Sequence, residues 1–188
     1  MSTITDPQLP DDTAVAQRDL RVCLPTWRGF DRHAFQSLRY ESQDVLAELC
    51  DLDMLQLSAG PAFRLRESWH RRLAFRDATG LLAFANPGLV PRPISQDCDV
   101  FLATCQTLKE LLFVNAVPNW RDRCRVSVCV IDELYAAEVA HSRNLLRLLR
   151  EFDHVFTELS GSVDAISDVI GRPCHCVPPA VDAIRFSP

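Results

Sequence analysis

Two adjacent carboxylates, Asp132 and Glu133, are the residues of this 188-residue chain that are best suited to chemistry. They follow the apolar run at 126–131, which is typical of a buried strand. In an open parallel sheet, ligands bind beyond the carboxyl ends of the strands, so both side chains are expected to face that crevice. One of them is a candidate general base for a substrate hydroxyl. Asp132 is also a competent N-cap for a helix that begins near Leu134, and this structural interpretation stays open.

Polar residues follow the other predicted strands as well. Their hydroxyl, amide, indole and carboxylate groups suit a hydroxylated ligand better than a phosphate. Strands end in polar residues in many folds without a ligand, so a purely structural role stays open. The candidate binding residues are Thr26, Trp27, Arg28, Thr104, Gln106 and Glu158.

Several common site chemistries are disfavoured by the glycine and cysteine patterns. The turn after the first predicted strand contains one glycine, Gly29, so it lacks the G-x-G-x-x-G pattern of a dinucleotide site. Gly161-Ser162 lacks the second glycine of a hydrolase nucleophile elbow. The eight cysteines lie mostly inside apolar runs, and Cys174-x-Cys176 lacks two further zinc ligands. We therefore predict structural thiols, no metal and no cofactor.

Strand and helix patterns alternate along the chain. This order predicts a doubly wound, Rossmann-like α/β domain with a mainly parallel sheet and helices on both faces. Residues 80–85 are a further, weaker strand candidate before a long loop to residue 96. Gly171 is the expected cap at the end of the last helix. The predicted strands are 21–25, 54–58, 99–104, 125–131, 154–157 and 174–177, and the predicted helices are 33–52, 63–77, 107–117, 138–152 and 162–170.

Composition narrows the possible partners and location. The 20 basic and 25 acidic residues are interspersed and give a net charge of -5, which disfavours nucleic acid as a partner. No apolar run approaches the roughly 18 residues of a membrane span, and the polar N-terminus does not resemble a signal peptide. We expect a cytoplasmic protein with no transmembrane segment. The predicted organisation is a disordered or loosely attached tail at 1–18, one domain at 19–180, and a connecting segment at 181–188.

Short motifs in the second half of the chain, from about residue 97 to 188, recur in this order in a group of bacterial glycosyltransferases. Asn86-Pro-Gly-Leu89 is also similar, whereas residues 1–80 match only in fold pattern. The chain thus resembles the N-terminal domain of GT-B, family 4-like glycosyltransferases. The motifs are Asp99-Val-Phe101 with Cys105-Gln106, Trp120-Arg121 with Cys124, Asp132-Glu133-Leu134, Leu146 to Phe152 with Asp153, Gly171-Arg172-Pro173-Cys174, and Val181 to Pro188.

The resemblance implies transfer of a sugar from a nucleotide sugar to a glycan or other hydroxyl acceptor, as in polysaccharide biosynthesis. This domain would hold the acceptor, whereas the nucleotide sugar would bind a C-terminal domain that the sequence does not contain. Residues 181–188 would begin the interdomain linker, and the chain alone is expected to be inactive. Glu133 or Asp132 would contact the acceptor or act as the base. The alternative function is a non-catalytic, Rossmann-like interaction module whose exposed interdomain face binds a partner protein.

Overall fold

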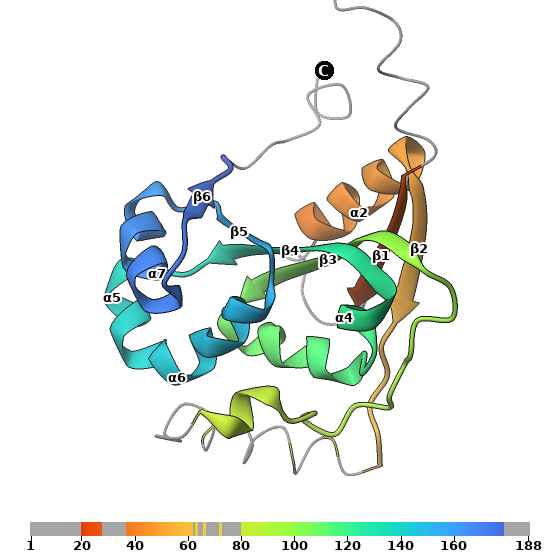
Figure 1. The fold of residues 1–188 in the computed structure, drawn as a ribbon, viewed down its shortest axis with the longest axis horizontal. Coiled ribbons are helices and arrows are strands. Elements are labelled where there is room, and N and C mark those ends of the chain that lie inside the picture. The colour runs from red at the N-terminus through yellow and green to blue at the C-terminus, as the bar shows by residue number, and fades with distance from the viewer. Residues whose placement is uncertain are drawn as a thin grey trace, which may run out of the picture.

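The computed structural model describes residues 20–27, 37–61, 63, 66, 72 and 80–178. In this part of the chain, six parallel strands form one sheet in the order β2-β1-β3-β4-β5-β6, which confirms the predicted fold class (Figure 1). The predicted tail at 1–18, the segment at 181–188 and most of the predicted helix at 63–77 lie outside the described residues.

The strands agree with the predicted order and differ at their ends. The second strand was predicted three residues too late, because Asp51 already pairs with Arg21. The fourth strand continues through Asp132 and Glu133, so these carboxylates belong to the strand and do not follow it. The strands are β1 (Arg21–Thr26), β2 (Asp51–Gln56), β3 (Cys98–Thr107), β4 (Cys124–Glu133), β5 (His154–Thr157) and β6 (Cys174–Cys176).

The helices are shorter and more broken than their apolar patterns predict. Residues 81–84 form a 3₁₀ helix, so the predicted strand at 80–85 is wrong. The single helix predicted at 138–152 is wrong too, because Ser142 leaves helical geometry at φ -105°, ψ 9°. Gly171, at φ 72°, is the predicted left-handed cap. The α-helices are α2 (Ser37–Leu49), α4 (Trp120–Arg123), α5 (Ala136–Val139), α6 (Arg143–Leu146) and α7 (Val163–Ile170); the 3₁₀ helices are η2 (Leu81–Phe84), η3 (Leu108–Ala116), η4 (Ala140–Ser142), η5 (Arg147–Glu151) and η6 (Ser160–Ser162).

Helices lie on both sides of the sheet. Parallel strands are joined by right-handed crossovers, so the direction of each step decides the side on which its helix lies. The step from β1 to β2 runs toward one edge, and the steps from β3 to β6 run toward the other. Accordingly, α2 lies on one side, and η3 and α6 lie on the opposite side (Figure 1).

The core on the side of η3 is built around three stacked aromatic rings. The Trp120 ring lies 4.8 Å from the ring of Phe101 and 4.9 Å from that of Phe152, centroid to centroid. All three side chains are buried. They join β3, α4 and the segment before β5, which fixes the centre of the sheet against its helical layer.

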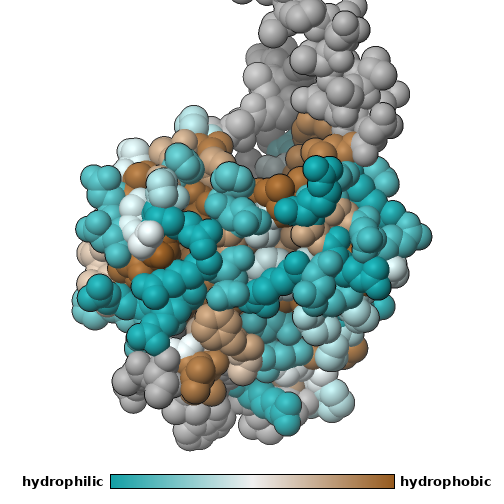
Figure 2. Space-filling view, in the orientation of Figure 1, coloured by the Kyte–Doolittle hydropathy of each residue, from teal (hydrophilic) through white to brown (hydrophobic). Residues whose placement is uncertain are grey.

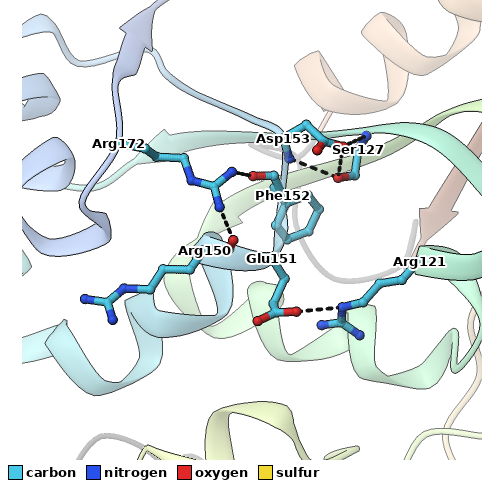
Figure 3. A network of polar contacts seen from close by, with 7 residues as sticks. All are labelled: Arg121, Ser127, Arg150, Glu151, Phe152, Asp153 and Arg172. Atoms are coloured by element: carbon cyan, nitrogen blue, oxygen red, sulfur yellow. Dashed lines mark hydrogen bonds and ion pairs between the residues drawn. The ribbon is translucent and has the colours of Figure 1, made fainter.

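Asp153 connects β5 to β4 (Figure 3). Its Oδ2 accepts hydrogen bonds from the backbone N–H and the hydroxyl of Ser127, both at 2.8 Å. These two bonds favour the charged carboxylate and lower the pKa of Asp153. The contact therefore aligns the start of β5 with the middle of β4.

Arg172 connects the last turn of the chain to the segment before β5. Its guanidinium donates hydrogen bonds to the backbone carbonyls of Arg150 and Phe152 (Figure 3). These carbonyls lie at the end of η5, where a helix leaves its last carbonyl groups without helical partners. The Arg172 side chain supplies those partners.

The loop before β3 is held by Asn86. Its Oδ1 accepts hydrogen bonds from the backbone N–H groups of Gly88 and Leu89, both at 2.9 Å. The Gly88 carbonyl accepts a 3.0 Å hydrogen bond from the N–H of Gly60. A Cβ on Gly60 would lie 2.5 Å from that carbonyl oxygen, so only glycine fits there. The turn at Asn86-Pro-Gly is thus held against the loop that follows β2.

Candidate functional site

A small opening lies beside the carboxyl ends of β1 and β3. β1 pairs with β2 along its whole length, from Arg21 to Thr26. Among the described residues, it pairs with β3 only at Val22 and Cys23, and Pro25, which has no N–H, cannot continue this ladder. The chain also reverses its direction of winding between these two strands. Sheets of this class bind ligands at such a point.

A small cavity lies in this opening. Its volume of about 20 Å³ is enough for one water-sized group, such as a ligand hydroxyl. The lining includes Thr26, Trp27 and Thr104 from the predicted binding residues. The other lining residues are Pro25, Gln43, Leu57, Ala103, Cys105, Glu110, Phe113 and Val114.

Two threonines face each other across the opening at the same level. Thr26 lies four residues beyond Val22, and Thr104 lies four residues beyond its partner Val100. The Thr26 hydroxyl donates a 3.0 Å hydrogen bond to Oε1 of Gln43 on α2. The Thr104 hydroxyl is buried, and no described residue bonds to it. A buried polar group without a partner costs about 1–3 kcal/mol, so this hydroxyl is available to a ligand.

Gln106 and Glu110 add a carboxylate to the same end of β3. The backbone N–H of Gln106 donates a 3.1 Å hydrogen bond to Oε2 of Glu110. Gln106 itself is buried. Sequence reasoning missed Glu110 because it lies inside a predicted helix. Its position in the first turn after a strand that ends in candidate residues was the available signal.

Aromatic rings form the apolar wall of the opening. The Trp27 ring lies 5.1 Å from that of Phe63 and 5.7 Å from that of Phe113, between centroids. All three side chains are half-buried. Apolar walls with a few fixed polar groups are typical of small-molecule sites.

No protein-family model matches this chain, and no curated protein or solved structure does so either. The arrangement of the site residues is therefore the basis for assigning a function.

The predicted carboxylates lie apart from this opening, on β4 and after β5. Asp132 and Glu133 occupy consecutive strand positions, so their side chains point to opposite faces of the sheet. Glu133 is exposed and Asp132 is half-buried. The N-cap of the following helix α5 is Tyr135, so the interpretation of Asp132 as that cap is wrong. Burial, together with the nearby Glu133 carboxylate, raises the pKa of Glu158.

Three thiols lie together near the opposite, amino end of the sheet. Burial raises the pKa of Cys23 and of Cys98, and it raises that of Cys124 to about 12. The thiolate is the reactive form of cysteine, so these values make all three poor nucleophiles. This agrees with the predicted structural role.

The remaining site predictions concern Arg28 and metal ions. Arg28 lies outside the described residues. Across the parts of the chain that are described, no three or more His, Cys, Asp or Glu side chains form a group that could hold a metal ion. Over the same residues, no helix combines the length and apolar character needed to cross a membrane.

Proposed function

We propose that this chain is the acceptor-binding domain of a glycosyltransferase-like protein, and that it holds a hydroxyl compound in the opening between β1 and β3. The ordered motifs from about residue 97 onward and the doubly wound sheet support this proposal. The observation that carries it is the buried Thr104 hydroxyl, which has no bond from the described residues and lines a cavity of hydroxyl size.

Each lining group has a role in this proposal. Thr104 bonds the entering hydroxyl of the acceptor, and Glu110 accepts a hydrogen bond from a second hydroxyl. Trp27 and Phe113 contact the apolar face of the acceptor. The bond between Thr26 and Gln43 keeps the opposite wall in place. Rigid placement of such groups lowers the cost of ordering a ligand.

The carboxylates on β4 and after β5 would serve the transfer step. Glu133 or Asp132 takes the proton of the acceptor hydroxyl as its oxygen attacks the anomeric carbon of the donor sugar. The nucleotide diphosphate leaves with the electron pair of the broken bond. Glu158, whose pKa is raised by burial and by the nearby Glu133 carboxylate, is the adjacent group that can take up or release a proton. In this proposal the donor is held by another domain.

A titration of the ¹⁵N-labelled full chain with methyl glycosides, followed by NMR, tests acceptor binding. We expect saturable shifts for Thr26, Trp27 and Thr104. Shifts confined to the amino ends of the strands, near Asp97 and Arg123, would contradict the proposal. The absence of any saturable shift would do so too. Tight, saturable binding of a nucleotide sugar such as UDP-glucose would contradict the assignment of the donor to another domain.

A further inference from the structure

Side chains on β3, β4 and β5 alternate between complete and partial burial. On the side of η3 and α6 they are buried: Phe101, Ala103, Cys105, Ser127, Cys129, Ile131, Val155 and Thr157. On the side of α2, apolar side chains remain partly exposed. We call this set the open face, and it consists of Val100, Leu102, Val126, Val128, Val130 and Phe156.

The open face is continuous across the three strands. Val100 is in register with Val126, and Leu102 is in register with Val128. Val130 is in register with Phe156, whose ring lies 5.6 Å from that of His175 on β6. Neighbouring strands are about 4.8 Å apart, so the rows of side chains touch. Hydrophobic atoms are visible between α2 and β6 in Figure 2.

Helix α2 covers the adjoining part of the same side. Val22, Leu24 and Thr26 on β1 are buried there, and Thr26 bonds to Gln43 of α2. From β3 to β5 there are two strand spacings, roughly 10 Å. A helix with its side chains is about 10–12 Å across. The open face therefore has the width of one helix beside α2.

We propose that the open face binds one amphipathic helix of another polypeptide, which lies beside α2 and antiparallel to the strands. Parallel sheets are normally covered on both faces, and the six apolar side chains of the open face are only partly covered. A second copy of this chain fits less well, because α2 projects about one helix layer, near 10 Å, above the sheet. That projection keeps two open faces from meeting. A helix bound there would cover Asp132 and Glu158, so it would exclude the transfer step proposed for these carboxylates.

Charge at the end of the open face favours this orientation. Asp132 lies two residues beyond Val130, and Glu158 lies two residues beyond Phe156, so both carboxylates end rows of the open face. A helix that runs antiparallel to the strands has its N-terminus at this end. The partial positive charge of a helix N-terminus is stabilised by nearby carboxylates.

A labelled peptide tests the proposal with the full chain. The probe is a fluorescein-labelled, 18-residue amphipathic helix with a leucine stripe and basic residues in its first turn, and the control peptide has the same composition in scrambled order. Fluorescence anisotropy should show at least about tenfold tighter binding of the helix. Val128→Asp should remove that preference, because it introduces a charge into the open face. Leu81→Asp is the matched control, since Leu81 is 72% exposed on η2, and it should leave binding unchanged.

Val128→Thr, which nearly keeps the shape of the side chain, is a second test in case Val128→Asp prevents folding. We expect it to keep the wild-type melting temperature within about 2 °C and to weaken peptide binding severalfold. Equal affinity for the helix and the scrambled peptide would overturn the proposal. So would a large loss of stability in Val128→Thr, because it would mean that the face is already covered. A dimer in light scattering that Val128→Asp dissociates would make a second copy the occupant and would also overturn it.

Discussion

Replacing Thr104 with valine should make the protein more stable and the acceptor site weaker. Valine has nearly the shape of threonine and lacks its hydroxyl. In the free protein that hydroxyl is buried, and no described residue bonds to it. Its removal therefore eliminates the free-energy cost of burying an unpaired hydroxyl, and it breaks no hydrogen bond among the described residues. The same removal takes away the group that we assign to the ligand.

The expected magnitude follows from that cost, which is about 1–3 kcal/mol for an unpaired buried group. Part of it is offset because Thr104 as a whole is only half-buried. We expect the free energy of unfolding to rise by about 1 kcal/mol. This raises the melting temperature by about 2–4 °C in a chain of this size. Binding of a methyl glycoside should weaken about tenfold, which is the effect of about 1.4 kcal/mol.

Thr26→Val is the matched control, at the same level on the neighbouring strand. Its hydroxyl does have a partner, Oε1 of Gln43, so its loss should lower the free energy of unfolding by about 1 kcal/mol. Thermal and urea unfolding followed by circular dichroism measure both variants. The two changes should have opposite signs. Equal destabilisation by both substitutions would refute the assignment of Thr104 as an unpaired, ligand-directed hydroxyl.

Two further predictions concern stability. Ser127 holds the pKa of Asp153 below its ordinary value of 3.8, so the stabilisation by this carboxylate is present above that pH and is lost as the pH falls through the lowered pKa. Urea unfolding should therefore separate Asp153→Asn from wild type at neutral pH and bring the two together near about pH 2; a constant gap would contradict the assignment. Gly60→Ala should lower the free energy of unfolding by about 1–3 kcal/mol because its Cβ meets the Gly88 carbonyl. Gly161→Ala, with no atom within 4 Å of its Cβ, should have little effect, and similar losses in both would argue against the close contact.

The sheet was predictable because its strands have short, nearly continuous apolar runs separated by helical patterns. The broken helix from α5 to η5 was not. Its leucines occur as the adjacent pairs Leu145-Leu146 and Leu148-Leu149, which fit one helix as well as they fit two short turns. Ser142 interrupts the helix through its backbone geometry, which the apolar pattern does not encode.

The site was predictable in part. Thr26, Trp27 and Thr104 follow or end apolar runs, and the structure brings them into one opening. Asp132 and Glu133 were expected side by side in a crevice because β4 was predicted to end before them. The strand in fact includes both residues, so the two side chains point to opposite faces of the sheet. That β1 and β3 lie side by side depends on sheet order, which no local pattern reveals.

The open face also depends on tertiary structure. Along β4, the valines Val126, Val128 and Val130 are partly exposed, whereas Ser127 is buried. From polarity alone, the three valines would be expected to be buried and Ser127 to be exposed. Helix packing determines which side of β4 is buried, because η3 and α6 lie on the side to which Ser127 points (Figure 1).

Arg172 has a consequence for how the molecule opens. Its guanidinium donates hydrogen bonds to two backbone carbonyls in the segment that precedes β5. Movement of β6 away from the sheet would therefore also strain these contacts with the end of η5. An edge strand of three residues would otherwise fray independently. With this link, the segment from η5 to β6 forms one cooperative unit of local unfolding, and its amide hydrogens exchange together.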